Sequence, residues 1–215
     1  MGFEVRTATL SNGLTILAEV DPAAHTAAAG FFVRTGARDE PSALMGVSHF
    51  LEHMMFKGSE RRNALEVNEG FDRIGASHNA FTSGEMTCFH AHVLPERLGE
   101  AVDMLADILR PALRQADFDE EKGVILEEIA MYEDNPFMAL YERMMERYYD
   151  AHPMGHRVLG TKETVGGMGR DAMERYFHDR YASDTMALAV AGRVDFDALV
   201  RQVQGVCGKW PRGTP

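Results

Sequence analysis

Residues 47–58 read VSHFLEHMMFKG and hold two histidines four positions apart with a glutamate between them. In an α-helix, positions i, i+3 and i+4 lie on one face, so His49, Glu52 and His53 point the same way. Two imidazoles one turn apart can hold a single Zn²⁺, and a carboxylate on the same face can reach the water that completes the metal's coordination. The stretch therefore predicts a metal-binding helix. The alternative from these residues alone is an amphipathic helix with two surface histidines.

The composition indicates a soluble globular protein. The 215 residues are 45% hydrophobic and 26% charged, which suffices for a well-formed core. The formal net charge of −11 argues against nucleic acid and anionic membranes as partners, since both attract clustered Lys and Arg. Two cysteines imply no disulfide framework. No signal peptide is visible and no apolar run approaches about 18 residues, so we expect a cytoplasmic location and no membrane contact.

The order of the expected elements predicts an α+β fold with a largely antiparallel sheet packed against helices. Asn12-Gly13 predicts a hairpin between strands at 5–10 and 14–20. Pro41-Ser42 is expected to open the motif helix, which ends at Lys57-Gly58. The remaining expected elements are strands at 26–34, 78–82, 86–93 and 186–191, helices at 64–74, 98–109, 170–181 and 196–207, a long helical stretch at 117–149 broken near Asn135-Pro136, and a loop-rich segment at 155–169.

A catalytic zinc takes three protein ligands, so the two histidines require a third group from elsewhere. Glu127 and Glu128 lie in the apolar helical run GVILEEIAMY, where a carboxylate needs a partner because burying it alone is costly. Glu121 lies two turns before Glu128 on the same helical face. The alternative is a solvated acidic stripe. Helical geometry does not separate Glu127 from Glu128, and a cysteine or another histidine stays open as the third ligand.

With this helix motif and the glutamates downstream of it, the chain resembles the pitrilysin/insulysin family of inverted zinc peptidases. Its half-length bacterial members and the mitochondrial processing peptidase β-subunits are the most similar. The resemblance covers nearly the whole chain and follows several stretches in order: Asn12-Gly13-Leu14, the HFLEH motif at 49–53, Phe56-Lys57-Gly58, GASHNAFTS at 75–83, VILEEI at 124–129 and Val158-Leu159-Gly160.

The resemblance implies a zinc-binding metallopeptidase domain over residues 1–208, with 209–215 as the start of an interdomain linker. It implies that His49, His53 and Glu128 are the zinc ligands and that Glu52 is the general base. It gives Glu121 the role of an outer glutamate that supports a ligating histidine.

The resemblance also implies a substrate and partners. Asn79, Ala80 and Phe81 match an edge strand to which an extended peptide adds as a further strand. The expected function is a zinc-dependent endopeptidase cleaving extended peptides or presequences, with a second homologous domain or subunit, or a homo-oligomer, as partner. The alternative is a zinc- and peptide-binding half that is inactive without that second domain or subunit.

Other metal sites are weaker interpretations. Cys88, His90 and His92 alternate along one expected strand and share a face, but such histidines commonly bond to backbone or water. His152 and His156 sit beside a proline in an expected loop, so the helical argument does not apply to them.

A different enzyme class, S-ribosylhomocysteine lyase, also uses H-x-x-E-H but takes a cysteine as third ligand. Neither Cys88 nor Cys207 has a sequence neighbourhood suited to that role, and the glutamates of the long helix would be unexplained. We expect Met144, Met145 and the other methionines to fill the core.

Overall fold

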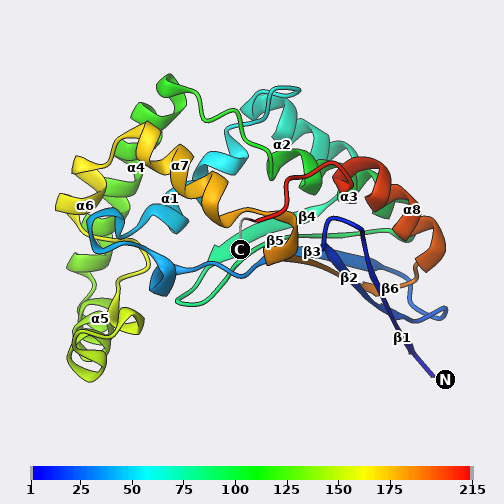
Figure 1. Ribbon diagram of the computed structural model, residues 1–215, viewed down its shortest axis with the longest axis horizontal. Helices are drawn as coiled ribbons and strands as arrows, with labels where there is room; N and C mark the ends of the chain where they lie inside the picture. The colour runs from blue at the N-terminus through cyan, green and yellow to red at the C-terminus, as the bar shows by residue number, and fades with distance from the viewer. Residues whose placement is uncertain (1, 214–215) are drawn as a thin grey trace.

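The computed structural model describes residues 2–213 and contains a six-stranded sheet with the strand order β1-β2-β6-β3-β5-β4 (Figure 1). Strands β2 and β6 run parallel, and the other neighbouring pairs are antiparallel. The predicted α+β fold with a largely antiparallel sheet is therefore confirmed. The strands are β1 (Glu4–Thr9), β2 (Thr15–Val20), β3 (Ala27–Val33), β4 (Ser77–Thr82), β5 (Thr87–Val93) and β6 (Met186–Gly192).

Most of the helices cover one face of the sheet, while α5 stands at the end of the molecule away from the N-terminus (Figure 1). No helix within residues 2–213 combines the length and apolar character needed to cross a bilayer. The α-helices are α1 (Val47–Phe56), α2 (Ala64–Arg73), α3 (Leu98–Ile108), α4 (Gln115–Asp134), α5 (Pro136–Tyr149), α6 (Lys162–Gly167), α7 (Arg170–Arg180) and α8 (Phe196–Cys207).

The core lies between the helices and one face of the sheet. Phe31 of β3 is paired with Leu188 of β6 and Phe89 of β5, and all three side chains are fully buried. Alternation along a strand then places Ala80, which pairs with Phe89, and Thr82 on the same helix-covered face of β4. Helix α1 packs against both β4 and α4. The motif helix thus lies next to an edge strand of the sheet.

The motif helix begins later than the sequence indicates. Ser42–Leu44 forms a short 3-10 helix, and α1 starts at Val47 after Gly46, whose φ of 93° is left-handed. A Cβ at Gly46 would lie 2.6 Å from the carbonyl oxygen of Leu159. Both the left-handed backbone and this close approach therefore require glycine here. The prediction that Pro41-Ser42 opens the helix was wrong, because the chain must turn at Gly46 before the helical hydrogen bonds can begin.

The long helical stretch breaks at Asn135-Pro136, as the proline in the sequence indicates. Helix α4 ends at Asp134, and Asn135 caps α5 by accepting hydrogen bonds from the backbone N–H groups of Phe137 and Met138. The segment at 155–169, expected to be loop-rich, contains the short helix α6, whose first turn is capped by Thr161.

Helix α5 is largely peripheral: none of its residues is fully buried. The prediction that the methionines fill the core was wrong for Met86, Met131 and Met144, whose exposed fractions are 40%, 61% and 53%. At the C-terminal end, Trp210 packs on Phe31 with ring centroids 5.7 Å apart. Residues 209–213 thus lie against the domain, residues 214–215 of the expected linker lie outside the described residues, and the domain boundary stays a prediction.

Candidate metal centre

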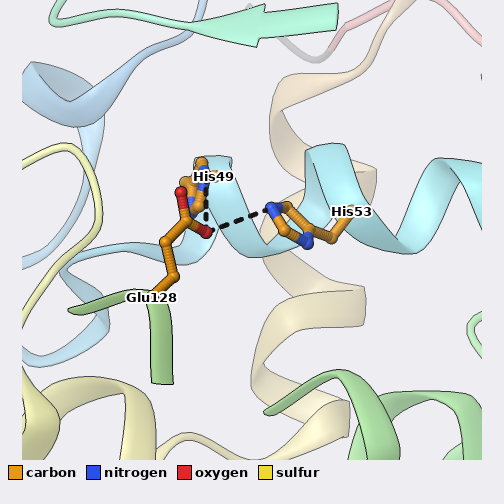
Figure 2. A group of neighbouring side chains, drawn as sticks. All are labelled: His49, His53 and Glu128. Carbon is orange, nitrogen blue, oxygen red and sulfur yellow. Dashed lines mark ion pairs between the residues drawn. The ribbon is translucent and has the colours of Figure 1, made fainter. Parts of the chain in front are cut away.

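Three side chains from two helices converge on one point (Figure 2). His49 and His53 stand one turn apart on α1, and Glu128 reaches them from α4. Its Oε2 atom lies 3.7 Å from Nε2 of His49 and 3.6 Å from Nε2 of His53. Tetrahedral zinc with bonds of about 2.0–2.1 Å holds its ligands about 3.3 Å apart. The spacing therefore fits one zinc ion after side-chain adjustments of a few tenths of an ångström.

His49 has the properties of a neutral ligand. Its side chain is buried, and burial, together with the charge of neighbouring His53, lowers its pKa to about 3. A neutral imidazole is the form that binds a metal. Its Nδ1 atom is buried and has no hydrogen-bond partner among residues 2–213. The Nε2 atom, in contrast, faces Glu128 and the point of convergence.

His53 is held by a carboxylate on its other side. Its Nδ1 lies 2.8 Å from Oε1 of Glu121, which is itself buried and lies 2.5 Å from Nζ of Lys57. Burial alone would lower the pKa of His53, but the hydrogen bond and charge of Glu121, with the nearby carboxylates, raise it. The hydrogen bond favours a proton on Nδ1 and leaves the Nε2 lone pair free for a metal. Glu121, singled out by resemblance, does contact a candidate ligand.

Glu52 shares the ligand-bearing face of α1 and is held by a residue that the sequence analysis missed. Thr82 of β4 donates a hydrogen bond of 2.5 Å from Oγ1 to Oε2 of Glu52. Burial raises the pKa of Glu52, and the Thr82 hydrogen bond and the charge of His53 oppose that rise. The alternation of residues along 77–82 is the signal that could have placed Thr82 on the same face as Ala80, toward the motif helix.

The two adjacent glutamates of α4 have different surroundings. Glu128 turns toward α1, whereas Glu127 is exposed to solvent. The buried positions of α4 set this orientation, since they place one helical stripe against the core: Phe118, Glu121, Ile125 and Ile129. The chain thus brings together the residues predicted as ligands, base and supporting glutamate.

The predicted substrate residues lie on the free edge of the sheet. Asn79, Ala80 and Phe81 belong to β4, the last strand in the sheet order. The backbone N–H of Ala80 donates to Oδ1 of Asn79 at 2.9 Å instead of to the neighbouring strand. That N–H is therefore directed to the free edge, where a carbonyl oxygen of a further strand can accept a hydrogen bond from it.

Two cavities flank the metal centre along this edge. The larger, of about 550 Å³, includes Ala80, Phe81 and Thr82 in its wall and extends under α5. The smaller, of about 320 Å³, includes Asn79 and lies on the Lys57 side. Glu52 lines both cavities. An extended chain along β4 would therefore pass the candidate base with a cavity on either side.

The rival metal sites do not assemble. Within residues 2–213, the one group of three or more His, Cys, Asp or Glu side chains with metal-ligand spacing is the His49, His53 and Glu128 group. Cys88 and Cys207 are buried free thiols outside it, which leaves the cysteine-ligated lyase site without support. His152 instead accepts a hydrogen bond from the backbone N–H of Met154, and His156 bonds through Nδ1 to the distant carbonyl oxygen of Ala37.

Sequence comparison identifies relatives that share nearly the whole chain. Residues 15–162 match the insulinase family, peptidase family M16. An "Uncharacterized zinc protease" of Bacillus subtilis (strain 168) is 39% identical over 203 residues, which cover 94% of this chain and 48% of the relative. Another of Streptomyces coelicolor is 39% identical over 206 residues, covering 95% of this chain and 45% of the relative. The chain spans about half the length of these relatives.

Solved structures agree with these sequence relatives. The crystal structure of pitrilysin superposes with a TM-score of 0.87 at 26% identity, over 99% of this chain and 23% of that one. A protease from Helicobacter pylori shares the fold, with a TM-score of 0.94 at 21% identity, over 99% of this chain and 52% of that one. The family match, the zinc protease relatives and a centre formed by the two HxxEH histidines of α1 with Glu128 of α4 lead to one conclusion: the chain belongs to the insulinase family of peptidases, family M16.

Proposed function

We propose that this chain is the zinc-bearing catalytic part of an endopeptidase that cleaves extended peptides or presequences. The observation that carries the proposal is the convergence of His49, His53 and Glu128 on the face of α1 that also bears Glu52. Three protein ligands leave one coordination position for water, which is the arrangement of catalytic zinc sites. The names of the relatives, which are called zinc proteases, support zinc as the metal at this centre.

When bound at this centre, zinc supplies Lewis-acid chemistry by lowering the pKa of a water molecule and polarising the scissile carbonyl. Glu52 accepts the proton of the attacking water on its carboxylate and delivers it to the leaving amine. Because burial raises the pKa of Glu52, its carboxylate holds this proton more readily than an exposed glutamate does. Thr82 fixes one oxygen of Glu52 through its hydrogen bond, so the carboxylate keeps its orientation.

The substrate lies along β4 as an added strand. Support comes from the free-edge position of β4 and from the outward N–H of Ala80, now bonded to the side chain of Asn79. A peptide carbonyl can replace that side-chain oxygen, because both are neutral amide acceptors. A strand in this position runs past both cavities and past Glu52.

A second candidate function is a zinc- and peptide-binding half that turns over substrate only with a second domain, a partner subunit or another copy. This candidate is favoured because the chain spans only about half the length of the relatives that it matches. The two candidate functions make different predictions for the isolated chain: it hydrolyses peptides under the first and only binds them under the second. A cytoplasmic location stays a prediction.

Three variants test the proposal. Glu52→Gln should retain one zinc per chain but lose about 10²–10⁴-fold in peptide hydrolysis, since an amide cannot accept the proton. Glu128→Gln should lose zinc, whereas Glu127→Gln, one residue away and exposed, should keep both zinc and activity. Elemental analysis and cleavage of a mixed peptide library give the two readouts. Full hydrolysis by Glu52→Gln would refute the base, and zinc and peptide binding without hydrolysis by the unchanged chain would select the second candidate.

A further inference from the structure

The first turn of the metal-binding helix α1 has no capping side chain of its own. The residue before the helix is Gly46, so the backbone N–H groups of this turn need acceptors from elsewhere in the chain. Glu40, buried in the loop between β3 and α1, accepts hydrogen bonds of 2.7 Å from the backbone N–H groups of Gly46 and Ser48. One carboxyl group therefore ties the start of α1 to the preceding loop.

Ser48 is also bonded to helix α7. Its hydroxyl oxygen lies 2.9 Å from the hydroxyl oxygen of Tyr176, and both side chains are buried. Helix α7 packs against α1, so this hydrogen bond joins two helices that are far apart in the sequence (Figure 1). A buried hydroxyl that lost this partner would be left unsatisfied, which is costly. Ser48 thus fixes α1 through its backbone and through its side chain.

The loop and α7 are joined directly as well. Arg180 of α7 donates a hydrogen bond of 3.0 Å to the carbonyl oxygen of Asp39, the residue before Glu40. The guanidinium carbon of Arg180 also lies 5.9 Å from the centroid of the Tyr176 ring. The loop, α1 and α7 are therefore connected pairwise around Ser48. We call Glu40, Ser48 and Tyr176 the Ser48 anchor.

The candidate ligand beside the Ser48 anchor has no hydrogen bond that orients its ring. His49 directly follows Ser48, and its buried Nδ1 has no hydrogen-bond partner among residues 2–213. His53 differs, because Glu121 lies 2.8 Å from its Nδ1. Ligating histidines usually donate their second N–H to an acceptor that fixes the ring. The direction of Nε2 of His49 therefore depends on packing and on where the backbone of α1 places the ring.

We infer that Glu40, Ser48 and Tyr176 are positioning residues for the metal ligand His49. They act through the backbone of α1, and the inference rests on the proposed zinc centre. Nε2 of His49 lies 3.7 Å from Oε2 of Glu128 on α4, so a shift of the first turn of α1 would move one ligand away from the others. Loss of the anchor should therefore change metal affinity and coordination geometry in a chain that is still folded.

Single substitutions remove the contacts of the anchor one at a time. Tyr176→Phe and Ser48→Ala each delete one hydroxyl group. Glu40→Gln replaces an accepting oxygen with an amide nitrogen, which cannot accept a hydrogen bond from a backbone N–H. Tyr181→Phe is the matched control for Tyr176→Phe. Tyr181 is a second buried tyrosine at the end of α7, and its hydroxyl makes no hydrogen bond to α1.

The first readout is the zinc affinity of the metal-free 215-residue chain, measured at one pH by competition with a fluorescent chelator. One hydrogen bond of ordinary net strength corresponds to about fivefold in an equilibrium constant, so Tyr176→Phe should weaken zinc binding by about that factor. Glu40→Gln disturbs two contacts and should weaken it by about tenfold, the lower end of the range for outer partners of metal ligands. Tyr181→Phe should leave the zinc affinity unchanged.

Two further readouts separate positioning from a general loss of stability. The visible spectrum of bound Co²⁺ depends on coordination geometry, so it should change in Tyr176→Phe and stay the same in Tyr181→Phe. Urea unfolding of the metal-free variants at the same pH shows that each is folded under the titration conditions. Because Tyr176 acts through the hydroxyl of Ser48, the double variant with Ser48→Ala should lose no more zinc affinity than Tyr176→Phe alone.

The outcomes distinguish this inference from the proposed function. Unchanged zinc affinity and an unchanged cobalt spectrum in Tyr176→Phe would overturn the inference. Equal losses in Tyr176→Phe and Tyr181→Phe, or additive losses in the double variant, would overturn it too. If Glu40→Gln does not fold, the two hydroxyl variants decide the question by themselves. Absence of zinc binding by the unchanged chain would refute the proposed function together with this inference.

Discussion

A chain of charged groups orients the histidine at position 53. His53 bonds through Nδ1 to Glu121, and Lys57 lies 2.5 Å from the second oxygen of that carboxylate. Lys57 stands one turn after His53 at the end of α1, so the same helix carries the candidate ligand and the cation that neutralises its support. The hydrogen bond from His53, followed by the contact with Lys57, lowers the pKa of Glu121. Glu121 therefore stays an acceptor, and Nε2 of His53 stays free for the metal.

Replacing Lys57 with methionine should weaken zinc binding, because Glu121 would lose the cation that holds it ionised and in place. Outer partners of metal ligands typically contribute about 10–100-fold in affinity, and we expect a loss within that range. Competition of the metal-free chain with a fluorescent zinc chelator measures it. The control is Lys162→Met, which removes an exposed lysine 2.5 Å from Glu133. Unchanged zinc affinity in Lys57→Met would exclude this role.

Glu40 fixes the other end of the motif helix. Its Oε2 accepts a hydrogen bond from the backbone N–H of Gly46 and its Oε1 accepts one from Ser48, both at 2.7 Å. These donors belong to the N-terminal end of α1, where a carboxylate is favoured. Burial nevertheless dominates and raises the pKa of Glu40 from 4.5 to about 8. The first turn of the metal-binding helix thus depends on a buried group that titrates near neutral pH.

The pKa of Glu40 predicts how stability depends on pH. Because the folded state binds this proton more tightly than the unfolded state, the stabilising contribution is complete below about pH 4.5 and is lost as pH rises through about 8. Asp39, Tyr176, Tyr181 and Arg180 are charged or titratable groups near it.

Glu40→Gln cannot titrate, so its free energy of unfolding should fall less across this window than that of the unchanged chain. Urea unfolding of metal-free protein, followed by circular dichroism, measures the slope, since zinc binding would add its own pH dependence. Parallel pH profiles for the two proteins would contradict the assignment.

Residue types and spacing in the sequence predict the candidate metal ligands well, but they predict the residues that surround those ligands poorly. His49 and His53 follow from helical periodicity, but Glu128 required the resemblance to a family, since Glu127 satisfies the same spacing. Thr82 could not be connected to Glu52, because their contact depends on where β4 packs against α1. Met145 was assigned to the core because a methionine lining a cavity and a buried one have the same sequence signal.

The boundaries of helices and strands also differ in how well the sequence predicts them, because some are set by local residues and others by contacts between distant segments. The hairpin at Asn12-Gly13 and the break at Asn135-Pro136 were predicted correctly, since turn and proline chemistry act locally. The late start of α1 depends on Gly46 packing against the Leu159 carbonyl, a contact between distant segments. The parallel pairing of β2 with β6 likewise joins strands at opposite ends of the chain, which local patterns do not encode.

The free edge of β4 leads to a prediction about peptide backbones. In an added strand only alternate residues turn their N–H and C=O groups toward the partner strand. N-methylation at successive positions of a bound peptide should therefore weaken binding with a period of two, measured calorimetrically with the zinc-loaded Glu52→Gln chain. Methylated positions that face solvent serve as internal controls. Uniform sensitivity, or none, would exclude strand addition as the binding mode.

At the scale of the whole molecule, the metal centre is partly open to water. The side chains of His53 and Glu128 keep 24% and 25% of their surface exposed. Water in the site would weaken the electrostatic interactions on which the proposed hydrolysis depends, because charges interact less strongly at high dielectric. The chain also spans about half the length of its relatives. A second homologous domain or another copy could cover the centre and exclude water.

We therefore expect the 215-residue chain, when monomeric, to bind zinc but to hydrolyse peptides slowly. The rate per chain should rise with concentration if copies associate, as light scattering would show, or when the second half of a longer family member is added in trans. Mixing that half with Glu52→Gln is the control, and it should give no gain if the chemistry occurs at this metal centre. A strictly monomeric chain that cleaves peptides equally fast with and without the added half would show that covering the site is unnecessary.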